Sequence, residues 1–450
     1  MATSREAFDA SVMAWRSFVL QQNTSADVQR LEPVLRDHYD ELVACGLAAD
    51  EASLIAFKRI GDIDIASRGF VAACCTQQWP SSSAASKNGI AGSGTDLRRV
   101  LALAVAAGAT IKLPDLLGLF HFEEAPGFFL KNAPIFVLPW LAVCLYLARH
   151  SGRAYLWSTA GVFVAAACVV NAYPFQWPGH TVVLTIIHLP IALWWFIGRL
   201  HAADRWHSDE GRMDFIRFSG ELCIFYVLIA LGGWVTIALT FTLFTAIGIN
   251  PQFLIQHWLV PCGAAGAFII AAWLAESRRV AVAAVAPVLT HVFTPLFALL
   301  LLAFLVTMLV TGQGIDIERQ ELIAFDVMLV LVLALLLYSM SARDGQAQPN
   351  LFDLLQLVLI CSALLADLLA LGAIAGRINE FGFSPNRVAA LGENILLLVN
   401  LAWAARLYVA FYRRRQPLQV LAHWQTRYLL VWSGWAAFVV LVFPPVFGFR

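Results

Sequence analysis

The stretch FGFSPNRVAALGENILLLVNLAWAARLYVAFYRRR, residues 381–415, reads as one apolar helix that ends in three arginines. About 20 apolar residues in a helix cross the hydrocarbon of a bilayer, so this stretch predicts a transmembrane helix. Three polar residues interrupt it at intervals of seven: Asn386, Glu393 and Asn400. Seven residues at about 100° each return to nearly the same face of a helix. The sequence therefore predicts a polar stripe that contains a carboxylate.

The rest of the chain has the same membrane character. Of its 450 residues, 60% are hydrophobic and 13% are charged, and the formal net charge is zero. A soluble domain carries about twice that share of charge, and a neutral chain has no field that favours nucleic acid. Apolar runs of transmembrane length recur from residue 97 onward and predict an all-α, polytopic membrane protein with about eleven spans. The spans are expected at 97–118, 132–149, 154–173, 181–200, 217–247, 254–275, 284–311, 322–341, 353–375, 388–411 and 428–446.

Basic residues are divided unevenly between the two sets of loops that these spans create. Fifteen arginines fall in one set and five basic residues in the other. Loops rich in Lys and Arg stay in the cytoplasm, so the asymmetry predicts a cytoplasmic N-terminus and an external C-terminus. The first set is Arg98, Arg99, Arg149, Arg153, Arg199, Arg205, Arg212, Arg217, Arg278, Arg279, Arg343, Arg413, Arg414, Arg415 and Arg427, and the second is Lys131, Arg319, Arg377, Arg387 and Arg450.

Residues 1–62 have the pattern of a small module of three helices. Phe8, Val12 and Trp15 lie at helical spacing on one face of the first helix. The second helix is expected to bury Val28, Leu31, Leu35, Leu42 and Val43, and the third to follow Asp50. Residues 63–96, which include a run rich in Ser, Gly and Ala, are expected to be a linker, and residues 97–450 the multi-spanning membrane domain.

Two parts of the chain resemble known families. The ending GLAADEASLIAFKRIGD, residues 46–62, together with Phe8, Trp15 and Leu31, resembles the bacterial permease prefix domain, a helical module that precedes multi-spanning membrane proteins. The segments FFLKNAPIFVLP (128–139), FIRFSGELCIFYVLIALGG (215–233), PVLTHVFTPLF (287–297) and INEFGFSPNRVAALGENILLLVN (378–400) resemble a family of bacterial multi-spanning proteins of unknown function. The resemblances imply a bacterial inner-membrane protein and no particular reaction.

A second carboxylate is expected near Glu393. Asp367 lies on the preceding span, which a short loop joins to the span of Glu393, so the two helices are expected to be antiparallel neighbours. At about 1.5 Å per residue, Glu393 lies ~8 Å and Asp367 ~12 Å below the outer surface. Charges in hydrocarbon are costly and normally face protein or water. Two interpretations stay open: an interhelical hydrogen-bond network in which one carboxyl keeps its proton, or a proton or cation site open to the outside. The candidate pathway residues are Asp367, Glu393 and Asn400.

Three further residues are secondary candidates. Glu221 follows Arg217 by four residues and is expected to form an ion pair with it. His291 is expected to be a structural histidine inside its span, and Arg387 is expected to cap the start of its helix.

No motif predicts a catalytic residue, a cofactor or a metal. His180 and His188 lie about 80° apart around their helix, which is a poor arrangement for a chelating pair. The sequence contains no phosphate-binding loop, no GxSxG and no HExxH.

The sequence favours a permease-like protein that moves a small solute or ion along intramembrane carboxylates. Two alternatives stay open. One is a signalling or scaffold protein whose residues 1–62 bind a cytoplasmic partner, and the other is a membrane-embedded enzyme that acts on lipid-linked substrates. The partners expected are the lipid bilayer and, through residues 1–62, a cytoplasmic protein; no nucleic-acid partner is expected.

Overall fold

The structure is a computed structural model of the whole chain, and it describes residues 8–13, 15–16, 25–45, 47, 51–53, 55–57, 59, 93–149, 151–277, 285–311, 319–341, 343 and 348–450. The chain divides into two compact units, Met1–Gly94 and Thr95–Arg450. The predicted linker 63–96 lies outside the described residues as far as residue 92.

The first unit has an apolar core of its own. Its longest described helix is α2 (Ser25–Ala44). The core consists of Phe8, Val12, Trp15, Leu31, Leu35, Tyr39, Leu42, Ala52, Ala56 and Phe57. Phe8 stacks on Tyr39 with ring centroids 3.7 Å apart. The expectation that Val43 is buried is wrong, because its side chain is 39% exposed and Tyr39 completes the i, i+4 stripe instead.

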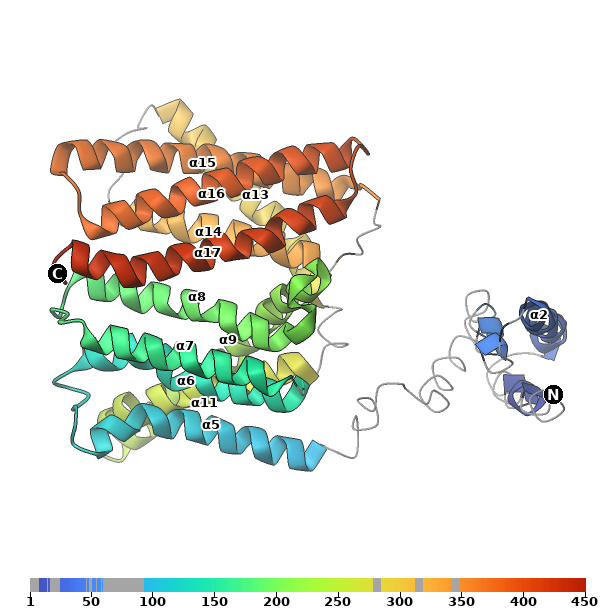
Figure 1. Cartoon of the computed structure of the whole chain (residues 1–450), viewed down its shortest axis with the longest axis horizontal. Coiled ribbons are helices and arrows are strands. Elements are labelled where there is room, and N and C mark those ends of the chain that lie inside the picture. The colour runs from blue at the N-terminus through green and yellow to red at the C-terminus, as the bar shows by residue number, and fades with distance from the viewer. Residues whose placement is uncertain are drawn as a thin grey trace. The chain divides into compact units, whose positions relative to one another are not determined.

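Long helices make up the second unit (Figure 1). They are α5 (Ser93–Leu116), α6 (Pro126–Arg149), α7 (Arg153–Ala172), α8 (His180–Ala202), η1 (Ala203–His207), α9 (Asp209–Ala246), α10 (Gln252–Leu254), η2 (Ile255–Leu259), α11 (Val260–Ser277), α13 (Val285–Thr311), α14 (Arg319–Ser341), α15 (Leu351–Phe381), α16 (Pro385–Tyr412) and α17 (Leu418–Val446). Helices α8, α14 and α16 all begin at the end of the bundle where the C-terminus lies (Figure 1).

Ten helices of the described residues are long and apolar enough to cross a membrane. The chain is therefore an all-α, polytopic membrane protein, as the sequence predicts. Each predicted span corresponds to a helix, but α5, at the predicted span 97–118, is not among the ten. It carries Arg98 and Arg99 near its start and Lys112 and Asp115 near its end. The side chain of Lys112 is 2% exposed and pairs with Asp115 at 2.9 Å.

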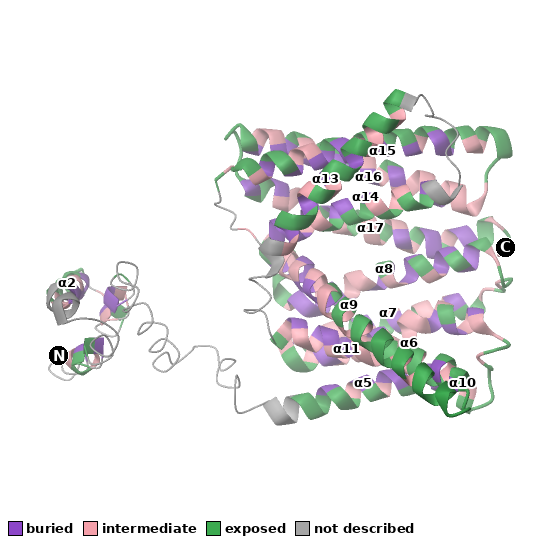
Figure 2. Cartoon of the chain, turned by 180° about the vertical axis from the view of Figure 1, so that it is seen from behind, coloured by how far each residue is buried: buried purple, intermediate pink, exposed green. Residues whose placement is uncertain are grey.

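Two apolar cores fill the membrane unit. One lies among α5, α6, α7, α8, α9 and α11, and the other lies among α13, α14, α15, α16 and the start of α17. Helix α17 packs against both α8 and α16, so it joins the two groups of helices. Figure 2 shows α9, a helix of 38 residues, crossing the bundle obliquely with a mostly exposed surface.

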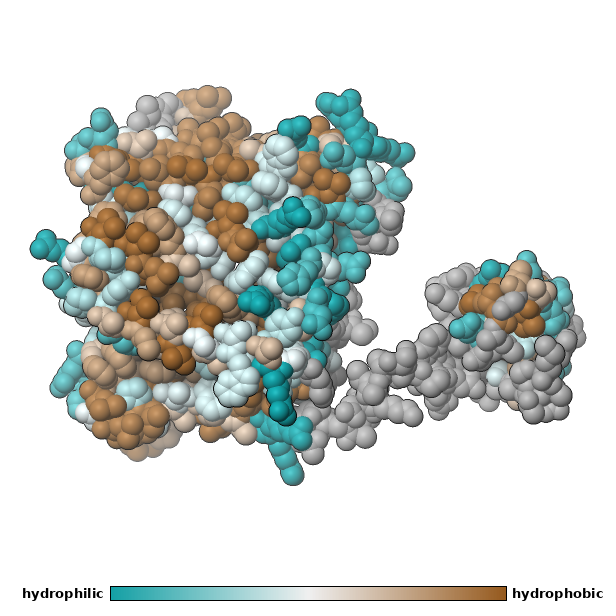
Figure 3. Space-filling view, in the orientation of Figure 1, coloured by the Kyte–Doolittle hydropathy of each residue, from teal (hydrophilic) through white to brown (hydrophobic). Residues whose placement is uncertain are grey.

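Side chains at the surface are sorted by polarity. Apolar residues cover the middle of the helices, and hydrophilic residues gather at their ends, most densely at the end where α5 begins (Figure 3). This is the pattern of helices surrounded by hydrocarbon.

Candidate functional site

Glu393 contacts a histidine from a distant helix. His188 of α8 brings its Nε2 atom to 2.5 Å from Oε1 of Glu393 on α16. The other ring nitrogen, Nδ1, lies 2.8 Å from the backbone oxygen of Leu184, one helical turn earlier. The histidine side chain is 4% exposed and that of Glu393 is 34% exposed. The carboxylate thus lies at the open side of the contact and the imidazole at its buried side.

A third carboxylate, Asp326 of α14, interacts electrostatically with both Glu393 and Asp367. Its Oδ1 accepts a hydrogen bond of 2.9 Å from Asn394, the residue after Glu393. The direct approach of Asp367 to Glu393 that the sequence predicts is not among the interactions of the described residues; each interacts with Asp326 instead. We call His188, Asp326, Asp367, Glu393 and Asn394 the acid site.

Asp367 has an uncommon environment. It is fully buried, with 0% exposure, and lies near the middle of α15. Neither of its carboxylate oxygens has a hydrogen-bond partner among the described residues. Buried polar groups nearly always have partners, and an unpaired charge in a low-dielectric interior costs several kcal/mol. Asp367 is therefore either protonated or able to receive an ion.

Local sequence explains why Glu393 faces α8. Ser384 caps α16, Pro385 is its first residue, and the guanidinium of Arg387 donates to the carbonyl oxygens of Phe381 and Gly382 at 3.1 and 2.8 Å. Arg387 thus closes the turn between α15 and α16. The expectation that it caps the start of its own helix is wrong, because Ser384 provides that cap. At Gly392 the rings of Trp435 on α17 come so near that an added Cβ would lie 2.1 Å from them. This close approach brings α16 against α17 and α8.

Asn400, the third pathway candidate, is not part of the acid site. It is fully buried and exchanges two side-chain hydrogen bonds with Gln425 of α17, of 3.1 and 3.2 Å. Both amides satisfy each other, so the pair fixes α16 against α17. The polar stripe of α16 therefore contacts two different helices: Glu393 contacts α8, and Asn400 contacts α17.

The secondary candidates lie elsewhere. Glu221 is 2% exposed on α9, and Arg217 donates to the backbone oxygen of Ser341, so no ion pair joins Arg217 to Glu221 among the described residues. His291 stacks on Phe352 with ring centroids 4.1 Å apart. Neither residue approaches the acid site.

A second buried group of charges lies at the opposite end of α8. Arg149 binds Glu276, with Nε 2.6 Å from Oε1, and lies 3.4 Å from Asp214. Its terminal nitrogen is 2.6 Å from Nε2 of His201, and Arg205 also reaches Asp214 at 3.3 Å. We call Arg149, His201, Asp214 and Glu276 the arginine cluster. Here the two acids share a guanidinium.

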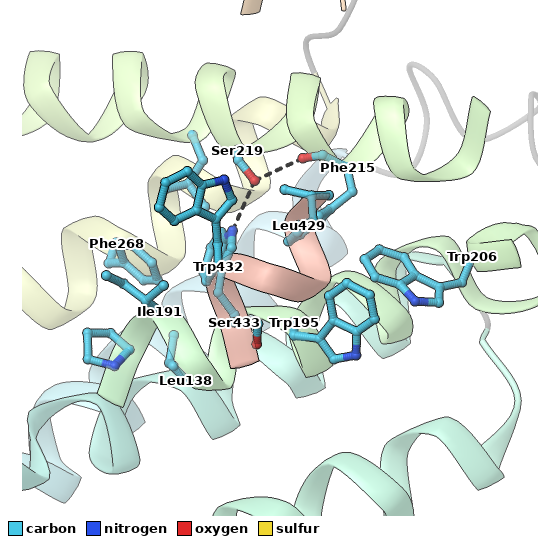
Figure 4. A pocket seen from close by; sticks show the side chains of 13 residues that line it. Leu138, Ile191, Trp195, Trp206, Phe215, Ser219, Phe268, Leu429, Trp432 and Ser433 are labelled. Atoms are coloured by element: carbon cyan, nitrogen blue, oxygen red, sulfur yellow. Dashed lines mark hydrogen bonds between the residues drawn. The ribbon is translucent and has the colours of Figure 1, made fainter. Parts of the chain in front are cut away.

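A cavity of about 420 Å³ lies among α6, α8, α9, α11 and α17 (Figure 4). It is lined by Leu138, Pro190, Ile191, Trp194, Trp195, Trp206, Phe215, Ser219, Leu222, Phe268, Leu429, Trp432 and Ser433. Ser219 accepts a hydrogen bond from Trp194 and donates one to the carbonyl of Phe215, and Ser433 donates to the carbonyl of Ala192. Because the lining is apolar and both hydroxyl groups are engaged, the cavity is unsuited to an ion.

Three residues of the acid site were missed by sequence reasoning: His188, Asp326 and Asn394. Asp326 carried a usable signal, since a lone carboxylate inside the apolar span 322–341 is costly and is normally functional. His188 carried none, because nothing in the sequence pairs residues of α8 with residues of α16. Among the described residues, no group of three or more His, Cys, Asp or Glu side chains is placed to hold a metal ion.

Compared with known proteins, the chain matches no protein-family model, no curated protein and no solved structure.

Proposed function

We propose that this protein is a permease-like membrane protein that moves a small ion or solute along the carboxylates of the acid site. The observation that carries the proposal is Asp367, a fully buried carboxylate whose two oxygens have no hydrogen-bond partner among the described residues. A carboxylate in this position reduces stability unless it binds something. Such residues in membrane spans are typical of ion and proton pathways.

Flux through vesicles tests this proposal. The purified full chain is reconstituted into phosphatidylethanolamine and phosphatidylglycerol vesicles, and entry of H⁺, Na⁺, K⁺ and a panel of small metabolites is measured under an imposed membrane potential. At least one of them is expected to enter faster than in protein-free vesicles, and Asp367→Asn is expected to abolish that excess. Glu123→Gln, which changes a 73% exposed carboxylate in a loop, is the control and should match the wild type. The proposal fails if nothing enters above the background.

The orientation and location that we propose are a bacterial inner membrane, with a cytoplasmic N-terminus and an external C-terminus. The arginines at one end of the bundle support this, since Arg149, Arg199 and the run 413–415 all lie at helix ends on the side where α5 begins. A reporter fused after Arg415 should read cytoplasmic and one fused after Arg450 should read external. The opposite reading for either fusion contradicts this orientation.

The separate core of the first unit favours a second candidate function, the binding of a cytoplasmic partner. We propose that residues 1–62 are a module of the permease prefix kind that folds by itself. Phe8, Trp15 and Leu35 are at most 3% exposed within that core. Residues 1–80 expressed alone should therefore be soluble and helical by circular dichroism. A random-coil spectrum would mean that the module needs the membrane unit to fold.

A further inference from the structure

The hydrogen bonds of His188 determine how many protons the His188–Glu393 pair holds. A backbone carbonyl can only accept, so Nδ1 of His188 donates to the oxygen of Leu184 at 2.8 Å. Nε2 of a neutral ring with that tautomer is an acceptor. Nε2 nevertheless lies 2.5 Å from Oε1 of Glu393, and an ionised carboxylate is also only an acceptor. One proton must therefore lie between the two atoms.

The pair thus holds one proton that an isolated neutral histidine and carboxylate would not hold. That proton is either on Nε2, as an imidazolium beside a carboxylate, or on Oε1, as a carboxylic acid beside an imidazole. When it leaves, two acceptors face each other at 2.5 Å, so the contact must open. Glu393, with 34% exposure, has room to move, whereas His188, with 4%, does not.

Asp367 supplies a place for a proton to go. Both of its oxygens lack a hydrogen-bond partner among the described residues, and its electrostatic neighbour is Asp326. Asn394 donates to Asp326 at 2.9 Å and so holds that carboxylate next to the residue that follows Glu393. Protonation of Asp367 would remove the cost of its unpaired charge.

The other charged groups around the site are few and are engaged elsewhere or lie nearer the helix ends. Arg387 donates to the carbonyls of Phe381 and Gly382, and His180 of α8 contacts Asn386. On the helices packed around the site, the remaining titratable residues toward this end are Arg319 and Glu321 at the start of α14, Arg377 and Glu380 near the end of α15, and Arg450 after α17. Helix α13 carries only His291, which stacks on Phe352.

We propose that the ion handled by the acid site is the proton, with the His188–Glu393 pair as the donor, Asp326 as the intermediate and Asp367 as the buried acceptor. This inference rests on the proposed function and names its ion. In the step, the proton leaves the Nε2–Oε1 contact and forms an O–H bond on the Asp326 carboxylate. That bond then breaks as an O–H bond forms on Asp367, so Asp326 is a carboxylate again. The pair is left as a neutral imidazole and a carboxylate, and the carboxylate regains a proton at its exposed side.

Infrared spectroscopy of the full chain in lipid tests the proton positions without any flux. The carbonyl band of a protonated carboxylic acid is followed as the pH is changed from acidic to alkaline. The wild type should show a band that disappears with rising pH. Asp367→Asn should remove most of that pH-dependent change, and Glu393→Gln should alter what remains. The Gln side chain can still donate to His188, so the contact is kept while its transferable proton is lost. The proposal is overturned if neither variant differs from the wild type.

Proton uptake into vesicles provides the second readout, with Glu123→Gln as the matched control. Glu123 also contacts a histidine, with His257 at 3.3 Å, but is 73% exposed. A pH-sensitive dye inside vesicles should report proton entry for the wild type and for Glu123→Gln, and at most one-tenth of that rate for Glu393→Gln and Asp367→Asn. If Na⁺ or K⁺ enters through the carboxylates with no dye response, the proton assignment is wrong and the permease proposal stands. If no ion or solute enters, the permease proposal fails, and the infrared result alone then decides whether the site holds the proton.

Discussion

His188 and His201 lie on one helix, about 20 Å apart at about 1.5 Å per residue, and their side chains are 4% and 0% exposed. Their partners differ. Nε2 of His201 lies 2.6 Å from a guanidinium nitrogen of Arg149, which can only donate, so this ring accepts a hydrogen bond and is not protonated at Nε2. Nε2 of His188 lies 2.5 Å from a carboxylate and shares a proton with it. The same side chain is thus a fixed acceptor in the arginine cluster and a proton carrier in the acid site.

The two regions also treat their carboxylates differently. In the arginine cluster Asp214 and Glu276 share the permanent charge of Arg149. Among the described residues, the carboxylates of the acid site have only His188 as a cationic partner, and its charge depends on a proton. A group of acids with an arginine is neutralised permanently, whereas a group with a histidine is neutralised only when protons are bound. This difference is the reason why we propose a structural role for one end of α8 and a transport role for the other.

The largest loss of stability is expected when the permanent charge of Arg149 is removed. Arg149→Met removes the guanidinium that Asp214 and Glu276, 19% and 17% exposed, share, and should lower the free energy of unfolding by about 3–5 kcal/mol. Thermal unfolding of the purified chain in detergent measures this change in stability. Arg205→Met is the control, because Arg205 reaches the same Asp214 but is 59% exposed, and its loss should cost less than about 1 kcal/mol. Equal losses for the two variants would mean that the arginine cluster does not depend on a buried ion pair.

Removal of Asp367 should change stability in the opposite direction and stabilise the protein. Because Asp367 has no hydrogen-bond partner among the described residues, Asp367→Leu abandons no partner and should raise stability by about 1–3 kcal/mol. Asp214→Leu, by contrast, should destabilise, since it removes an acid that Arg149 contacts. A loss of stability in both variants would show that Asp367 has a partner that the contacts described above do not include.

The neutral pair Asn400 and Gln425 in the same bundle should give a loss of stability of intermediate size. Asn400→Ala should cost about 1–3 kcal/mol, because it leaves the amide of Gln425 buried and unpaired. The double variant with Gln425→Ala should cost less than the sum of the two single variants, which a double-mutant cycle measures. Additive losses would mean that the two amides do not depend on each other.

The smallest effect is expected at an exposed ion pair in the first unit. Arg36 contacts Asp9 at 2.5 Å with both side chains more than 40% exposed, so Arg36→Met should cost less than about 1 kcal/mol. The hydrogen bond with Asp9 is the main cause that raises the pKa of Arg36. Its contribution is fully present below the ordinary pKa of arginine and is lost only as the pH rises past the raised value. The prediction is contradicted if the contribution of Arg36 to the stability of the isolated module changes between acidic and mildly alkaline pH.

The sequence predicted the architecture because the signals for it are local. Apolar runs and their lengths locate each span, and the start of α9 at Asp209, rather than at residue 217, follows from Ser208, which caps the helix. The count of about eleven spans was less certain at α5, where Arg98, Arg99, Lys112 and Asp115 reduce the apolar character.

The acid site could be predicted only in part. The cost of charge in hydrocarbon marks Glu393 and Asp367 from the sequence, and would have marked Asp326. The partner of Glu393 could not be found in this way, since His188 is 205 residues away and only the packing of α8 against α16 and α17 brings it there. Asn400 shares a helical face with Glu393 but contacts a different helix, which periodicity alone cannot distinguish.

The pH dependence of thermal stability tests most directly whether the acid site binds protons. Stability depends on pH wherever the folded chain and the unfolded chain bind different numbers of protons. The melting temperature of the full chain in detergent is measured from acidic to alkaline pH for the wild type, Glu393→Gln, Asp367→Asn and the control Glu123→Gln. The account predicts a pH-dependent profile for the wild type and the control, and a flatter one for each of the two acid-site variants. If all four proteins give the same profile, the acid site does not take up protons and Glu393 is a packing residue.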